Sequence, residues 1–218
     1  MARIAFDLDG TLIDSAPDIQ GIANTLMTED GLAPFTLEQV RDFIGNGVVV
    51  FVQKMRAARA IPDAAHDKLL ERFVSRYHSA TTLTEIYPGV RETLQALNTA
   101  GHALGICTNK PIGPTKAVLK HLSLNIYFET IIGGDSLPVS KPDPAPLLAA
   151  FGALGEGPAI YVGDSEVDAQ TATRAKVPFL LFTEGYRKVP VDELPHTQAF
   201  DHFSKLPDLV ATLLVETT

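Results

Sequence analysis

The sequence predicts an α/β protein with a doubly wound parallel sheet and a small all-helical cap inserted after the first strand. From about residue 83 onward, short apolar strands alternate with helices, which is the pattern of right-handed βαβ crossovers and a parallel sheet. Between residues 15 and 82, every segment has the pattern of a helix. We therefore expect residues 1–14 and 83–218 to form the α/β core and residues 15–82 to form the cap domain.

The first strand is a short apolar run that begins at Ile4 and leads into Asp7-Leu8-Asp9-Gly10-Thr11. Alternate residues of a strand point the same way, so the carboxylates of Asp7 and Asp9 leave the strand end on one side. Two carboxylates this close repel each other unless a cation is present. The pair thus indicates a site for a hard divalent ion, or a carboxylate nucleophile. A solvated turn after an edge strand is the alternative interpretation.

The insertion begins with a predicted helix at residues 16–29, with Ser15 as its N-cap and Asp14 as part of the same helix start. Thr36 and Gln39 form a capping box for a second short helix. Gly45-Asn46-Gly47 ends that helix, and residues 48–55 are apolar on nearly all sides, which predicts a buried helix. A fourth helix starts near Pro62, and its apolar face carries Leu69, Leu70, Phe73, Val74 and Tyr77.

The core segments follow the insertion. The predicted strands are 103–107, 130–132, 159–162 and 179–182, and the predicted helices are 90–100, 114–121, 145–154, 165–175 and 206–215. The segment 184–203 is rich in proline and charge and gives no clear prediction. Ligands of doubly wound sheets bind beyond the carboxyl ends of the strands. The polar residues that stand out lie at those ends: Asp7, Asp9, Thr108, Asn109 and Asp164.

Three motifs after later strands could complete a site there. Thr108 and Asn109 supply a hydroxyl and an amide for phosphate oxygens, although both residues also favour capped turns. Lys141 could neutralise a phosphoryl group, although a lone lysine is usually a solvated surface charge. Asp164 leaves a strand end and Asp168 lies one helical turn on, so both can face the first acid pair. The preference of acids for helix N-termini is an alternative explanation for Asp168.

The composition excludes some classes of partner. The 218 residues carry a net charge of −8, and nucleic acids or anionic membranes require clustered lysine and arginine. Cys107 is the single cysteine, so no intrachain disulfide can form. We find no signal peptide pattern and no apolar run of membrane-spanning length, and therefore expect a cytoplasmic protein. The sequence does not predict an oligomeric state.

Together these motifs resemble, in order, motifs I to IV of the haloacid dehalogenase-like phosphatases, and the resemblance covers essentially the whole chain. The helical insertion is similar to the C1-type cap of that family. The cap motif Gly45-Asn46-Gly47, with Thr108-Asn109-Lys110-Pro111 and Ser140-Lys141-Pro142-Asp143-Pro144, is most similar to bacterial phosphoglycolate phosphatases. The resemblance implies a Mg²⁺-dependent phosphomonoester hydrolase that forms an aspartyl-phosphate. Its substrate is then a small phosphorylated metabolite, 2-phosphoglycolate above all.

The resemblance also implies roles for residues. Asp7 would be the nucleophile and Asp9 the general acid and base. Thr108, Asn109 and Lys141 would hold the transferring oxygens or offset their charge. The magnesium ligands would be the side chains of Asp7 and Asp164 and the main-chain carbonyl of Asp9, with Asp168 in support. The expected substrate-binding residues are Thr11, Gly45, Asn46 and Gly47, and Thr11 is also expected to hydrogen-bond to Asp9.

Several other functions stay open on the motifs alone. A phosphosugar mutase of the same fold would return the phosphoryl group to its substrate. A pyrophosphatase or a 5′-nucleotidase-type phosphatase would use the same motifs. A non-enzymatic phosphoacceptor domain is disfavoured by the Asp9 spacing and by the cap. Charge for a carboxylate-bearing substrate could come from Arg41, Lys54 or Arg56 in the cap.

Overall fold

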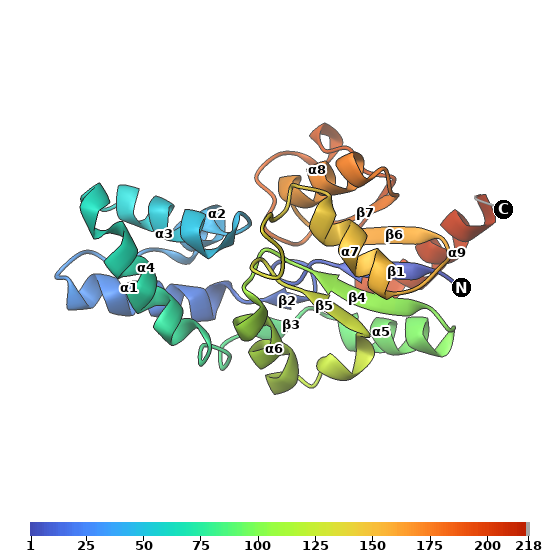
Figure 1. Ribbon diagram of the computed structural model, residues 1–218, viewed down its shortest axis with the longest axis horizontal. Helices are drawn as coiled ribbons and strands as arrows, with labels where there is room; N and C mark the ends of the chain where they lie inside the picture. The colour runs from blue at the N-terminus through green and yellow to red at the C-terminus, as the bar shows by residue number, and fades with distance from the viewer. Residues whose placement is uncertain (217–218) are drawn as a thin grey trace.

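The computed structural model describes residues 1–216 and confirms the doubly wound α/β fold (Figure 1). Within these residues, six strands form one sheet in the order β5-β4-β1-β6-β7-β8, and each neighbouring pair is parallel. The strands are β1 (Arg3–Phe6), β4 (Ala103–Cys107), β5 (Thr130–Ile132), β6 (Ala159–Gly163), β7 (Phe179–Phe182) and β8 (Gln198–Phe200). The first strand of the chain therefore lies in the middle of the sheet.

Helices cover both faces of the sheet. They are α5 (Val90–Thr99), α6 (Ile112–His121), α7 (Ala145–Ala153), α8 (Glu166–Ala175) and α9 (Leu206–Glu216). Side chains of β1 alternate between the faces: Ile4 and Phe6 pack with α5, α6 and α9, whereas Ala5 packs with α7 and α8. The alternation of a strand thus divides the apolar core into two layers.

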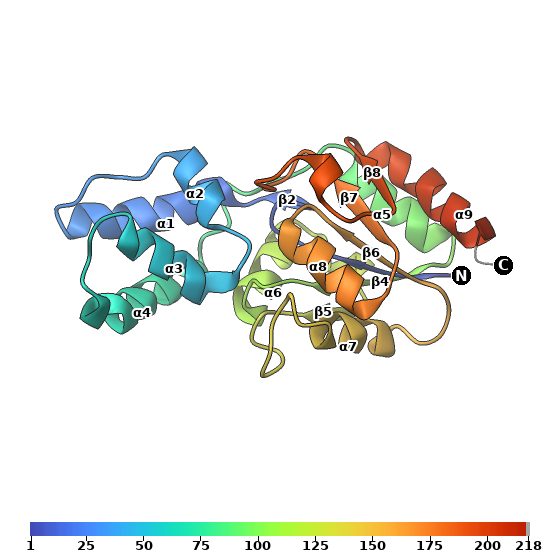
Figure 2. The ribbon, with the colours of Figure 1, turned by 90° about the horizontal axis from the view of Figure 1, so that it is seen from above.

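The remaining helices form the cap, which lies beside the carboxyl edge of the sheet in both ribbon views (Figure 2). They are α1 (Ala16–Glu29), α2 (Leu37–Phe43), α3 (Gly47–Ala57) and α4 (His66–Tyr77). The cap has its own apolar cluster, whose members come from these helices and their connections, with Tyr186 of the core as the exception. Five aromatic rings run through it in successive contact, namely Phe35, Phe43, Phe51, Phe73 and Tyr77.

Two short strands join the cap to the core, and the sequence did not predict them. They are β2 (Ile13–Asp14) and β3 (Glu85–Ile86), which pair antiparallel. Asp18 of α1 strengthens the junction, because its carboxylate accepts the Leu83 N–H at 3.0 Å and the Thr84 hydroxyl at 2.6 Å. Asp14 belongs to β2, and its carboxylate also accepts the N–H of Ala16, the first residue of α1, at 3.2 Å, which agrees with its predicted place at the start of that helix.

Most predicted elements are confirmed, including the capping box between Thr36 and Gln39. Ser15 does precede α1, but its hydroxyl makes no cap hydrogen bond. The prediction of a fully buried helix at residues 48–55 was wrong, because α3 buries one face and leaves Val49 45% exposed. The segment 184–203, for which there was no clear prediction, contains the edge strand β8.

Candidate active site

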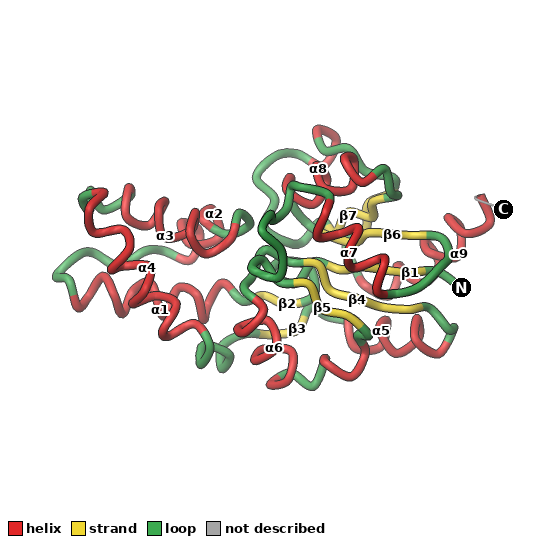
Figure 3. The backbone as a smooth tube through the Cα atoms, viewed as in Figure 1, coloured by secondary structure: helices red, strands yellow, loops and turns green. Residues whose placement is uncertain are grey.

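The polar residues predicted at the strand ends line pockets where the sheet meets the cap. Figure 3 shows the loops that follow the strands at this edge lying beside the cap helices. Asp7 and Asp9 line two adjoining pockets there. The larger pocket encloses about 450 Å³, part of it open to solvent, and has core residues on one side and cap residues on the other. The carboxyl edge of the sheet is thus the floor of a cleft that the cap covers.

Asp7 follows β1 directly, and the buried ammonium of Lys141 lies between Asp7 and Asp168. Lys141 Nζ lies 2.9 Å from Asp7 Oδ1 and 2.7 Å from Asp168 Oδ1, and it also donates to the Tyr161 hydroxyl at 2.8 Å. Its approach to Asp7 has the distance of an ion pair but not the angle of a hydrogen bond. Asp7 Oδ1 therefore has no hydrogen-bond donor among the described residues, although it is buried.

Burial has the largest effect on the protonation of Asp7. It raises the pKa of Asp7 to about 6, even though Lys141 opposes the shift. Burial also acts to raise the pKa of Asp168, but the Lys141 ammonium together with hydrogen bonds from Ser165 and Tyr161 outweighs it and holds that pKa below its usual value. Lys141 itself has a raised pKa, since its two carboxylate neighbours overcome the cost of burying it. Asp168 is thus the permanent counter-ion of Lys141, and Asp7 is the less well-compensated carboxylate.

Asp164, which follows β6, is the second acid at the centre of the site. Its Oδ1 accepts the Thr11 hydroxyl at 2.6 Å, and its Oδ2 accepts the Tyr186 N–H at 2.7 Å. Thr11 is fully buried and lines neither pocket. Its hydrogen bond to Asp164 takes the place of the expected one to Asp9. This contact orients Asp164 and leaves Thr11 out of reach of a substrate.

The acids are close enough to hold a cation. Carboxylate oxygens of Asp7, Asp164 and Asp168 lie within 4.8 Å of one another. Burial and the neighbouring carboxylates raise the pKa of Asp164 well above its usual value, and Asp7 Oδ1 has no donor. An all-oxygen set of this kind suits a hard divalent ion. The fit is best at Asp7 and Asp164, because the Asp168 oxygens are already bound by Lys141, Tyr161 and Ser165.

The backbone approaches this acid cluster closely. Gly10 has φ +89°, and a Cβ there would lie 2.5 Å from Asp164 Oδ2. The turn after β1 therefore requires glycine for its conformation and for the space beside Asp164. This close approach is the physical reason for a glycine between Asp9 and Thr11.

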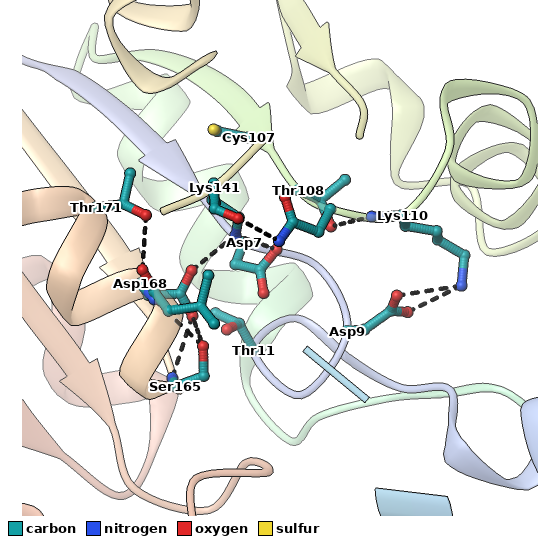
Figure 4. Close-up of polar contacts among 12 residues, drawn as sticks. Asp7, Asp9, Thr11, Cys107, Thr108, Lys110, Lys141, Ser165, Asp168 and Thr171 are labelled. Carbon is teal, nitrogen blue, oxygen red and sulfur yellow. Dashed lines mark hydrogen bonds and ion pairs between the residues drawn. The ribbon is translucent and has the colours of Figure 1, made fainter. Parts of the chain in front are cut away.

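Asp9 has partners of its own, on the other side of the cleft from Lys141 (Figure 4). Lys110 donates to its two carboxylate oxygens at 3.0 and 3.3 Å, and the Ser15 hydroxyl donates to Oδ1 at 2.5 Å. Lys110 also donates to the hydroxyl of Tyr77, at the end of α4, at 3.0 Å. The Ser15 hydroxyl that was expected to cap α1 thus holds Asp9 instead. Each acid of the first pair has a separate ammonium as its partner.

Thr108 and Asn109 reach the same cleft from the end of β4. Thr108 accepts the Lys110 N–H at 3.2 Å through Oγ1, which leaves the hydroxyl hydrogen for an oxygen in the pocket. The Asn109 amide donates to the carbonyls of Gly45 at 3.1 Å and Lys141 at 3.0 Å. Its Oδ1 is buried without a donor among the described residues. Asn109 therefore fastens the cap to the core and is not a free donor for a phosphate oxygen.

The cap loop Gly45-Asn46-Gly47 faces the cleft, with Gly45 and Gly47 in the larger pocket and Asn46 in the smaller one. The cap cations suggested from the sequence lie elsewhere. They are bound as follows: Arg41 to Asp14, Lys54 to the Asp42 carbonyl, and Arg56 to Asp63 and the Ile61 carbonyl. The predicted cap loop is thus in place, but those three side chains do not line either pocket.

Three residues of the site were not predicted as such. Lys110 sits inside a recognised motif, but a lysine next to Asn109 has the pattern of a surface turn. Tyr77 was assigned to the apolar face of a helix, and only the fold shows that this face ends at the active-site cleft. Tyr186 lies in the segment 184–203 and connects Asp164 to Asp14, whose carboxylate accepts its hydroxyl at 2.5 Å.

Comparison with known proteins decides the family. The model of the haloacid dehalogenase-like hydrolases matches residues 4–182 of this chain. The protein is a haloacid dehalogenase-like hydrolase. Its relatives include the phosphoglycolate phosphatase of Cereibacter sphaeroides strain ATCC 17029, which is 51% identical over 98% of this chain and 100% of the relative. Another, from Rhodobacter capsulatus, is 44% identical over 95% of both chains.

A solved structure agrees with the sequence relatives. The predicted phosphoglycolate phosphatase of Haemophilus somnus is 30% identical, covers 95% of this chain and 97% of its own, and superposes with a TM-score of 0.88. The hydrolase described here is therefore a phosphatase that acts on a small phosphorylated substrate. None of its described helices has the length and apolar character needed to cross a membrane.

Proposed function

We propose that this phosphatase hydrolyses 2-phosphoglycolate with Mg²⁺, through an aspartyl-phosphate on Asp7. The observation that carries the proposal is the position of Asp7: a buried carboxylate on the pocket floor, next to an ammonium and with one oxygen lacking a hydrogen-bond donor. The relatives of highest identity named above are phosphoglycolate phosphatases, which supports this substrate over other small phosphomonoesters.

In the first step, an Asp7 oxygen attacks phosphorus, a new oxygen–phosphorus bond forms, and the ester oxygen–phosphorus bond breaks. Asp9 gives its proton to the leaving alkoxide, which departs as glycolate. In the second step, Asp9 takes a proton from a water molecule, which attacks phosphorus and breaks the bond to Asp7. Inorganic phosphate leaves, and both acids return to their starting states.

The surrounding residues stabilise charge during these steps. The Thr108 hydroxyl donates to a transferring oxygen, and Lys141 offsets the negative charge beside Asp7. Asp168 acts through Lys141, because it holds the ammonium in place. Asn109 acts by holding the Gly45 loop over the cleft.

The acid cluster fits Mg²⁺. Asp7 and Asp164 would bind it through their side chains and Asp9 through its main-chain carbonyl. The bound ion would supply positive charge against the phosphoryl oxygens. The protein itself orients the Asp164 carboxylate for this role. Thr11 and the Tyr186 N–H hydrogen-bond to its oxygens, and the Gly10 turn brings the backbone close to it.

We further propose that residues 15–82 are a cap domain that opens to admit substrate, and that residues 1–14 and 83–218 are the catalytic core. The separate apolar cluster of the cap supports this division. So does the junction, where the chain crosses through the short strands β2 and β3.

The test is a panel of small phosphomonoesters, assayed for kcat/KM by release of inorganic phosphate with Mg²⁺ and with EDTA. We expect 2-phosphoglycolate to rank first, glycolate and phosphate to appear in equal amounts, and EDTA to abolish turnover until Mg²⁺ is restored. Asp7→Asn should be inactive. An isomeric sugar phosphate without phosphate release would instead identify a mutase, and activity indifferent to EDTA would exclude the metal.

A further inference from the structure

The two sides of the larger pocket differ in polarity. The cap contributes mostly apolar side chains, among them Phe51 and Phe73, together with the Tyr77 hydroxyl. The core contributes the acids, Thr108, Asn109 and Lys110. Of the described residues that line this pocket, Lys110 is the one cation. A substrate whose phosphoryl group lies at Asp7 places the rest of its structure in this space.

Lys110 is buried in the pocket wall, and its ammonium is fixed by hydrogen bonds. It is 6% exposed, and its three N–H groups are shared between the Asp9 carboxylate and the Tyr77 hydroxyl. Its ammonium also lies 4.5 Å from the centre of the Tyr77 ring. The Lys110 ammonium forms an ion pair with the Asp9 carboxylate at 3.0 Å. A buried, preorganised ammonium binds an anion more strongly than a solvated one.

A second feature faces the same space. Helix α3 has 11 residues and begins at Gly47, with no side-chain cap at Asn46. Gly47 and Val48, in its first turn, line the pocket, and the first amides of a helix carry partial positive charge. A Cβ on Gly47 would lie 3.4 Å from the Asn109 carbonyl, so this helix start lies against the loop that carries Lys110. The positive end of α3 and Lys110 therefore serve one pocket.

We infer that Lys110, with the N-terminus of α3, is the group that recognises the carboxylate of the substrate. This inference rests on the proposed function and names its specificity determinant. The substrate carboxylate takes the place of the Asp9 carboxylate on the Lys110 ammonium, so one ion pair replaces another. Asp9 keeps its hydrogen bond from Ser15 and is released to exchange protons with the leaving oxygen.

This arrangement gives selectivity for phosphomonoesters with a carboxylate close to the phosphoryl group. A phosphomonoester whose alcohol part is uncharged leaves the Lys110–Asp9 ion pair intact, because it brings no carboxylate to displace Asp9. Tyr77 ties the same ammonium to the cap, so recognition at Lys110 requires α4 to be in the closed position seen here. Arg41, Lys54 and Arg56 contribute nothing to this selectivity, since their partners lie outside the pocket.

The test compares two esters of the same length, 2-phosphoglycolate and 2-hydroxyethyl phosphate, in which a neutral CH₂OH replaces the carboxylate. We expect Lys110→Met to lower the ratio of their kcat/KM values by roughly 30-fold or more, the usual effect of removing one partner of a buried charge pair. The loss should appear mainly as a higher KM for 2-phosphoglycolate, because the carboxylate is bound equally in ground and transition states.

Controls separate recognition from structure. Lys120→Met removes an exposed lysine of α6 and should leave the ratio unchanged. Lys110→Arg keeps the charge and should retain more of the ratio than Lys110→Met, and Lys110→Gln answers the same question if the Met variant does not fold. Far-UV circular dichroism and melting curves check each variant.

Other outcomes would overturn the inference in distinct ways. If Lys110→Met lowers kcat for both esters equally and leaves their ratio intact, Lys110 only positions Asp9. If the wild-type enzyme itself does not distinguish the two esters, carboxylate recognition is absent, and the proposed substrate fails together with the inference. If the wild type prefers 2-phosphoglycolate and an Arg41 variant loses that preference, the proposed substrate stands and the assignment to Lys110 is wrong.

Discussion

Replacing Asp7 with asparagine should make the metal-free protein more stable while it removes all turnover. The native carboxylate is buried, and burial raises its pKa from the usual 3.8 to about 6. Asparagine keeps the shape and one acceptor oxygen but has no charge to bury. The Lys141 ammonium retains Asp168 as its partner in the variant.

The magnitude and the pH window follow from the same shift. The native carboxyl group holds its proton more tightly than the unfolded one, so its stabilising effect is complete below pH 3.8 and is lost as the pH rises through about 6. At about 1.4 kcal/mol per pKa unit, the ionised group costs the native state about 3 kcal/mol above that range. The advantage of Asp7→Asn should therefore be small near pH 4 and reach about 2 to 3 kcal/mol at pH 7.5.

Urea denaturation in EDTA at pH 4.5, 6 and 7.5 measures this difference. The matched control is Asp192→Asn, an exposed position that should change the free energy of unfolding by less than about 0.5 kcal/mol at each pH. Addition of Mg²⁺ should reverse the order, since a bound cation stabilises the wild type and not the variant. An Asp7→Asn protein that is no more stable than the wild type at pH 7.5 in EDTA would refute the reasoning.

Three further substitutions test other parts of the site. Lys141→Met leaves two buried carboxylates without their ammonium, so urea denaturation should show a loss of about 3 to 5 kcal/mol, and a loss below 1 kcal/mol would contradict the buried ion pairs. Gly10→Ala should weaken Mg²⁺ binding roughly tenfold or more in a titration of activity, because its Cβ would press on Asp164. Gly31→Ala, which has a similar positive φ and open space around it, should leave Mg²⁺ binding unchanged. Asp18→Ala removes the acceptor of two hydrogen bonds between α1 and the junction, and thermal unfolding should reveal a cost of about 1 to 3 kcal/mol.

The sheet was predictable because its strands are short apolar runs that end in polar residues. Residues 103–107, 130–132 and 179–182 were assigned with the bounds that the structure has. Local signals of this kind need no knowledge of the rest of the chain. The strands β2, β3 and β8 lacked such signals: two of them have two residues each, and their pairing depends on how distant segments are brought together.

The convergence of Asp7, Asp9, Thr108 and Asp164 was also predictable, since parallel strands place their carboxyl ends at one edge of a sheet. Their partners were not. Whether the Ser15 hydroxyl accepts from an N–H of the helix or donates to Asp9 depends on which group lies near it after folding, and both fit its sequence position. Lys110 and Tyr77 meet through the packing of the cap on the core, which no local pattern encodes.

The central position of β1 has a consequence for how the protein reaches its native state. Arg3 pairs with both Ala103 and Ala159, so the strand that precedes Asp7 is made before both of its neighbours and acquires the second one only after β6 has been made. Helices α1–α4, whose contacts are nearly all local, can form in the interval. Closing the sheet around β1 pairs the two neighbouring strands that lie farthest apart in the sequence, β1 and β6, and should limit the folding rate. The order of synthesis therefore leaves β1 without its second neighbour until most of the chain has been made.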